Sequence, residues 1–164
     1  MHEVLKDTDL FRGFSPEWIR QLSAIGRSRV LAEGDYLFLL GDSAECIYVV
    51  VRGKVDLCLP MRFGEAVRDV PVESAAAGKA LGWSGLVKPY RFTLSARAAE
   101  PSEAIGFSRS ELHRLFGAVP ELGNRFLANL SELVGLRLLT FQALWVRELQ
   151  RALEIESAHR PAGV

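Results

Sequence analysis

Between residues 28 and 107 the chain alternates short apolar runs with glycine-containing turns, and this rhythm limits the possible folds more than any other feature. Glu33-Gly34-Asp35, Gly41-Asp42-Ser43 and Arg52-Gly53 have turn composition, because glycine accepts positive φ and aspartate bonds to its own backbone. The turns recur about every ten residues, which is the strand spacing of an all-β sandwich or barrel. This region is therefore predicted to form a β-roll.

The apolar runs between the turns are the predicted strands. Alternation is clearest in Lys54–Leu59, where every second residue is apolar, as expected for a strand with one buried face. The predicted strands are Arg29–Ala32, Tyr36–Leu40, Cys46–Val51, Lys54–Leu59, a hairpin over Met61–Pro71 with Phe63-Gly64-Glu65 near its tip, Phe92–Ala98 and Glu103–Phe107.

Helical patterns flank the predicted roll. Ser15 is a good N-cap and Pro16 suits the first helical position, so a helix is expected from there to Gly26, after a shorter helical turn near residues 4–10. After the roll, Ser108 and Glu111 have the spacing of a capping box, which predicts a short helix.

A long helix is predicted from Pro120 to about Ser157, and it is apolar nearly all round between Leu133 and Val146. A helix with two apolar faces must bury both. One face can cover the β-layer and the other can pair with the same helix of a second copy, which predicts a homodimer. Arg137 and Glu148 interrupt the best heptad registers, so a regular coiled coil does not follow. The alternative is an intramolecular helix that lies across the whole roll.

Composition limits the class of partner. The chain has 164 residues, of which 20 are Lys or Arg and 20 are Asp or Glu, so its formal net charge is zero. One domain is expected at this length. Neutrality argues against nucleic acid as a partner, since such binders carry a basic excess. No apolar stretch is long enough for membrane insertion, and Cys46 and Cys58 are expected to be reduced core thiols of a cytoplasmic protein.

No constellation of residues supports catalysis or a metal site. His2, His113 and His159 are far apart, and no CxxC or HxxxH motif is present. The sequence Gly82-Trp83-Ser84-Gly85 is not a nucleophile elbow, because its second glycine follows the serine directly. We therefore expect neither an enzyme nor a metal centre.

Three sequence segments stand out beside the order of the predicted elements: Glu33–Ala44, Ile47–Val55 and Phe11–Ser15. Together they resemble the cyclic nucleotide-binding domain, the sensor domain of catabolite activators, protein kinase A regulatory subunits and cyclic-nucleotide-gated channels. The similarity extends from about Leu5 to Arg151. The resemblance implies a mainly β fold, a double-stranded β-helix or jelly-roll-like β-roll. The expected division of a single domain over 1–164 is an N-terminal helical part (1–27), the roll (28–107), C-terminal helices (108–157) and a tail (158–164).

In that family the phosphate-binding cassette is a Gly-Glu pair that opens a short helix, followed by an arginine and a small residue. The resemblance implies that the glutamate binds the ribose 2′-hydroxyl and the arginine pairs with the cyclic phosphate. Here Gly82 is in place, Trp83 stands at the glutamate position and Phe92 at the arginine position, with Arg91 one residue earlier. The candidate ligand-binding residues are Gly82, Trp83, Ser84, Gly85, Leu86, Arg91, Phe92 and Thr93.

Two functions remain open from these residues. Two lost charge-assisted hydrogen bonds at about 1.5–3 kcal/mol each would weaken nucleotide binding by roughly 10²–10⁴. A first hypothesis is a regulatory sensor module whose ligand is a cyclic nucleotide or another small anion, and need not be cAMP or cGMP. The second is a degenerate member in which Trp83, Tyr90 and Phe92 fill the pocket as core, and which acts as a protein-interaction or dimerisation module. Residues 154–164 are too few for the helix-turn-helix domain of catabolite activators, so no DNA-binding role is expected of this chain alone.

Overall fold

The computed structural model describes residues 2–158. Contacts divide the chain into two compact units, Met1–Asn129 and Leu130–Val164. The first unit holds every strand and all helices except the greater part of the last helix, α4 (Pro120–Ala158). The division into a single domain stays a prediction.

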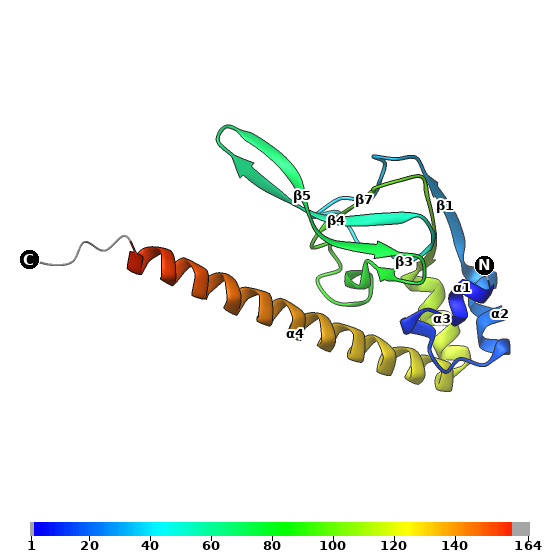
Figure 1. The fold of residues 1–164 in the computed structure, drawn as a ribbon. Helices are drawn as coiled ribbons and strands as arrows, with labels where there is room; N and C mark the ends of the chain where they lie inside the picture. The colour runs from blue at the N-terminus through cyan, green and yellow to red at the C-terminus, as the bar shows by residue number, and fades with distance from the viewer. Residues whose placement is uncertain (1, 159–164) are drawn as a thin grey trace, which may run out of the picture. The chain divides into compact units, whose positions relative to one another are not determined.

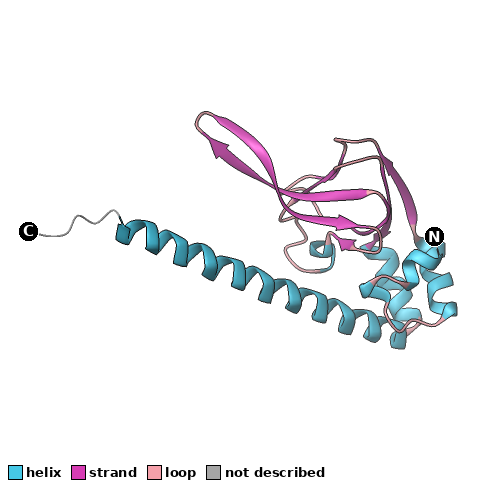
Figure 2. Cartoon of the chain, viewed as in Figure 1, coloured by secondary structure: helices cyan, strands magenta, loops and turns pink. Residues whose placement is uncertain are grey.

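Eight strands form two four-stranded sheets in the first unit (Figures 1 and 2). Every strand pair is antiparallel. Neighbouring strands are mostly not consecutive in the chain, as expected of a jelly-roll, and the predicted fold class is confirmed. The first sheet has the order β1 (Arg27–Leu31), β8 (Ser102–Ser108), β3 (Cys46–Arg52), β6 (Ala80–Leu81), and the second β2 (Tyr36–Phe38), β7 (Ser95–Ala98), β4 (Lys54–Phe63), β5 (Ala66–Ala76).

The tight turns depend on glycine, as the sequence predicts. Gly53, between β3 and β4, has a φ of +80°, and a Cβ there would lie 2.6 Å from the Pro101 carbonyl oxygen. Gly64 and Glu65 form the turn of the β4–β5 hairpin, which confirms the predicted hairpin tip.

Two strands are shorter than the sequence predicts. β2 ends at Phe38 rather than Leu40, and β7 begins at Ser95 rather than Phe92. The backbone just after β2 and just before β7 is held by hydrogen bonds outside the strand ladder. The Leu40 N–H donates to Ser95 Oγ, and the Phe92 N–H donates to the Asp42 carbonyl. These loop hydrogen bonds replace the ladder that the apolar runs predicted.

Helices cover the outer face of the first sheet. α1 (His2–Lys6), the 3₁₀ helix η1 (Asp9–Phe11) and α2 (Pro16–Ile25) precede the roll, and α3 (Arg109–Ala118) follows it. Ser15 caps α2 as predicted, since its hydroxyl accepts the Trp18 N–H. The fully buried Phe11 packs on Phe107 of β8, with ring centroids 5.6 Å apart.

The predicted long helix is confirmed as α4, 39 residues that run through Gly123 and Gly135 without a break. Its first turns belong to the first unit. There the buried Asn129 side chain donates to the carbonyl oxygens of Leu10 and Arg12. Within residues 2–158, no helix has both the length and the apolar character needed to cross a membrane.

Candidate ligand-binding site

The segment that aligns with the family's cassette forms a 3₁₀ helix, η2 (Trp83–Leu86), directly after β6. Gly82 stands at its N-cap with a φ of +71°, a conformation that favours glycine. A Cβ on Gly82 would lie 3.0 Å from the Phe92 ring, and one on Gly85 would lie 2.8 Å from the Cys46 carbonyl oxygen. Both glycines therefore allow η2 to pack closely on the roll.

Phe92, at the position of the family's arginine, lies inside the roll. Its side chain is 5% exposed and stacks on Phe38 with ring centroids 3.8 Å apart and planes 10° apart. Phe38 stacks in turn on Tyr48, at 5.7 Å. All three rings belong to the apolar cluster between the sheets, together with Leu81 and Ala96.

Arg91 and Thr93, on either side of Phe92, are both exposed. The Arg91 guanidinium donates to the Gly41 carbonyl oxygen at 2.7 Å, and Arg91 forms an isolated β-bridge with Ser43. The backbone directly before Arg91 is irregular, because Tyr90 has a φ of +58°. The Arg91 side chain nevertheless makes its hydrogen bond to the turn at Gly41.

The rest of the candidate set lies on η2. Ser84 is buried, whereas Trp83 and Leu86 are half-buried. Two backbone N–H groups of this turn already donate hydrogen bonds within the chain. The Gly85 N–H donates to the Gly82 carbonyl and the Val87 N–H to the Ser84 carbonyl. The structure thus brings η2 and Phe92 together and places Arg91 and Thr93 on the solvent side.

Arg109 is a residue of this region that the sequence did not single out. One guanidinium nitrogen lies 3.2 Å from the carbonyl oxygens of both Ala44 and Gly85, and its carbon lies 4.0 Å from the centroid of the Tyr90 ring. Its backbone N–H donates to the Glu45 carbonyl. Because Arg109 is the first residue of α3, it joins η2 and the loop before β3 to the start of that helix.

Two titratable groups of this region, Tyr48 and Cys46, are neutral at pH 7. Burial raises the pKa of Tyr48 to about 12, and burial also raises the pKa of the Cys46 thiol. Cys46 and Cys58 are both free thiols. These groups therefore provide no charge to match a phosphate.

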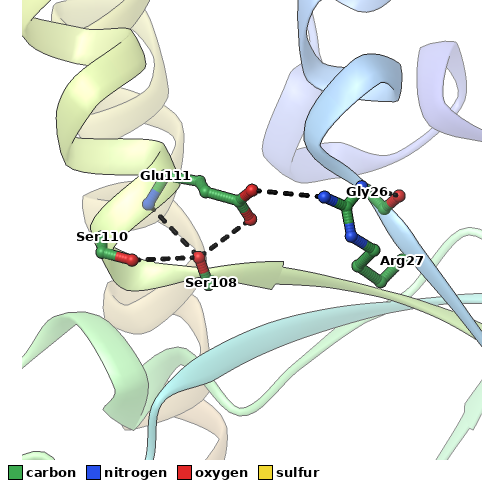
Figure 3. A network of polar contacts seen from close by, with 5 residues as sticks. All are labelled: Gly26, Arg27, Ser108, Ser110 and Glu111. Carbon is green, nitrogen blue, oxygen red and sulfur yellow. Dashed lines mark hydrogen bonds and ion pairs between the residues drawn. The ribbon is translucent and has the colours of Figure 1, made fainter.

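The start of α3 is fixed by a second polar cluster (Figure 3). The Ser108 hydroxyl accepts the Glu111 N–H at 3.2 Å and donates to the Glu111 carboxylate at 2.9 Å. The same carboxylate lies 3.5 Å from the Arg27 guanidinium, at the beginning of β1. The predicted cap is confirmed, and its glutamate also links α3 to the strand that follows α2.

Residues 28–118, more than half of the chain, match the sequence model of the cyclic nucleotide-binding domain. Potassium channel KAT3 of Oryza sativa subsp. japonica is 29% identical over 131 residues, which cover 79% of this chain and 25% of the channel. The chain thus spans a quarter of the length of that curated relative.

Solved structures have the same fold. A cyclic nucleotide-binding domain from Methylobacillus flagellatus superposes with a TM-score of 0.73 at 23% identity, over 91% of this chain and 80% of that one. The N-terminal domain of a transcriptional regulator from Streptomyces coelicolor superposes with a TM-score of 0.69 at 25% identity, over 80% of this chain and 91% of that one.

Proposed function

Because the chain belongs to the cyclic nucleotide-binding domain family, we propose that it is a regulatory module whose roll is closed to cAMP and cGMP by its own side chains. The observation that carries this proposal is the stack of Phe92 on Phe38, at the position where the family's arginine would pair with the cyclic phosphate. This favours the second of the two functions that the sequence left open.

The energetics support the same choice. Trp83 and Phe92 replace two charged partners of the nucleotide, which removes about 1.5–3 kcal/mol for each lost hydrogen bond. Moving the buried Phe92 ring aside would cost a further ~1.5–3 kcal/mol of apolar burial. Arg91 could pair with a phosphate only by giving up the hydrogen bond that its guanidinium donates to the Gly41 carbonyl oxygen.

We infer that this module acts by assembling with other protein chains. We assign the exposed apolar side chains of α4 to contact with another copy of the chain, as a homodimer at least, with a further protein partner receiving the signal. The proposed role is non-enzymatic. The free thiols of Cys46 and Cys58 favour the cytoplasm as its compartment.

Isothermal titration calorimetry and thermal shift of the full chain test the closed roll. With cAMP, cGMP and cyclic dinucleotides up to millimolar concentration, we expect no saturable heat and no rise in melting temperature. A saturable signal that Arg91→Ala abolishes would overturn the proposal and restore the sensor hypothesis. Arg68→Ala is the matched control, because Arg68 is an exposed arginine on the β4–β5 hairpin.

A further inference from the structure

The strand β1 lies at one edge of the first sheet, where it pairs with β8 on one side and has an open edge on the other (Figure 1). Its register is unbroken, from Arg27 opposite Gly106 to Leu31 opposite Ser102. Outside that ladder, no backbone group of residues 27–31 makes a hydrogen bond within residues 2–158. Alternate residues of an antiparallel strand turn their N–H and C=O groups to opposite sides, so β1 presents unpaired donors and acceptors at its open edge.

The other three edge strands are less suited to pairing. β6 has two residues, and β2 has three in an irregular register. β5 is longer, but Pro71 lacks an N–H and the register shifts where Cys58 meets it. β1 contains neither proline nor glycine. It therefore offers an uninterrupted edge.

The open edge of β1 does not depend on where the residues after Asn129 lie. β1 and β8 both belong to the first unit. The rest of the described chain, to residue 158, is the helix α4, whose N–H and C=O groups bond to one another along the helix. A helix in any position cannot complete a strand ladder. The backbone that matches the unpaired groups of β1 is that of an extended chain.

The side chains of β1 narrow the choice of that extended chain. Val30 is 76% exposed, on the face of the strand opposite to the buried Leu31. Arg29 is exposed on the Leu31 face, and within residues 2–158 its guanidinium makes no hydrogen bond or ion pair. Arg27 shares that face but already lies 3.5 Å from the Glu111 carboxylate. An added strand therefore meets one apolar side chain and one unpaired cation at adjacent positions.

The β1 strand of a second copy is a poor occupant. Pairing two β1 strands antiparallel over their full length places Arg29 opposite Arg29, and like charges directly opposite each other destabilise a strand pair. An acidic side chain in that place stabilises the pair instead. The arginine that discourages self-pairing thus favours a different, acidic strand.

We propose that the open edge of β1 binds an extended segment of a partner protein. The segment adds a strand to the first sheet and places an acidic side chain opposite Arg29 and an apolar one opposite Val30. This inference goes beyond the proposed function, since neither the closed roll nor assembly through α4 enters it. It identifies the surface at which a further protein partner binds.

NMR titration of the ¹⁵N-labelled full chain tests the edge with a defined probe. The probe is the acetylated and amidated peptide Thr-Val-Glu-Thr-Thr, whose Val and Glu meet Val30 and Arg29 when it runs antiparallel to β1. At millimolar concentration we expect saturable shifts of the backbone amide signals of residues 27–31 and slower hydrogen exchange there. No saturable shift, or shifts confined to other elements, would overturn the inference.

Two further peptides separate backbone pairing from simple charge attraction. The peptide with Lys in place of Glu should bind about three- to tenfold more weakly. A version of the acidic peptide in which every backbone N–H is methylated keeps the charge but loses its donors, so it should give no saturable shift. Equal binding of the methylated peptide would rule out strand addition, and equal binding of the Lys peptide would rule out selection by Arg29.

A charge reversal in the protein gives the second test. Arg29→Glu should invert the preference, so that the Lys peptide binds more tightly than the Glu peptide. Arg114→Glu is the matched control, because Arg114 is an exposed residue of α3 and the change in net charge is the same. The control should keep the preference for the Glu peptide. An unchanged preference in Arg29→Glu, with the circular dichroism spectrum of the parent, would overturn the inference, and so would an inversion in the control.

Discussion

Phe92 carries more of the roll's stability than its place in a loop between β6 and β7 suggests, because its ring is buried against Phe38. Phe92→Ala should lower the free energy of unfolding by about 3–5 kcal/mol, the usual cost of removing a buried aromatic ring. Urea unfolding measures this change. Trp83→Ala, at a half-buried side chain of η2, should cost less, and equal losses would show that Phe92 is not the central residue of this cluster.

Arg109 should be sensitive even to lysine. A lysine ammonium lacks the planar group that meets the carbonyls of Ala44 and Gly85 while stacking on Tyr90. We expect Arg109→Lys to cost about 1–2 kcal/mol and to speed hydrogen exchange of the Gly85 amide. Arg114→Lys, at an exposed position of the same helix, should stay within about 0.5 kcal/mol of the parent. Equal effects of the two variants would contradict the role given to Arg109.

Tyr48 makes stability depend on pH in the alkaline range. Its pKa is about 12 in the folded chain and 10 as the reference value, so between these values the folded state holds a proton that the unfolded state has lost. Stability is therefore fully present below pH 10 and falls as pH rises towards 12, by at most about 1.4 kcal/mol per pH unit. Tyr48→Phe should make the urea midpoint fall less steeply over this range. Parallel pH curves for the two proteins would disprove the assignment to Tyr48.

For single residues, the sequence predicted which residues stand at the cassette positions better than it predicted which groups they contact. Gly82 and the replacement of a charged residue by Phe92 were visible in the spacing, and the buried ring agrees with the alternative in which this segment is core. Arg109 was visible only as a residue of a helix cap, because its carbonyl partners lie 24 and 65 residues away. No local pattern reports contacts at that separation.

Among the elements, α3 depends on its N-cap. Ser108→Ala removes the acceptor of the Glu111 N–H and should cost about 1 kcal/mol. Ser110→Ala provides the control, because Ser110 only touches the Ser108 hydroxyl, at 3.3 Å. Thermal unfolding should separate the two variants. A loss in Ser110→Ala as large as in Ser108→Ala would mean that the cap is not what stabilises this end of the helix.

Element boundaries were predictable where the signal is local. Caps at Ser15 and Ser108 and the turn at Gly53 act on adjacent residues, so the sequence located α2, α3 and the β3–β4 turn. The predicted end of β2 lay two residues too far along the chain, and the predicted start of β7 lay three residues too early. Apolar side chains continue beyond both strands, but bonds such as Leu40 N–H to Ser95 Oγ, formed across 55 residues, set where pairing stops.

For the whole molecule, the division at Asn129 separates a unit with its own core from the greater part of α4, which carries exposed apolar side chains as far as Ile155. A chain that ends after Leu136 keeps the complete roll, the helices around it and the Asn129 bonds to Leu10 and Arg12, but lacks the exposed apolar side chains from Leu138 onward. It should fold as a monomer whose melting temperature is independent of concentration. The full chain should melt at higher temperature as its concentration rises, because association stabilises only the folded state. Differential scanning calorimetry over a hundredfold concentration range compares the two, and a concentration-dependent transition in the shortened chain would place the assembly surface on the first unit instead of on α4.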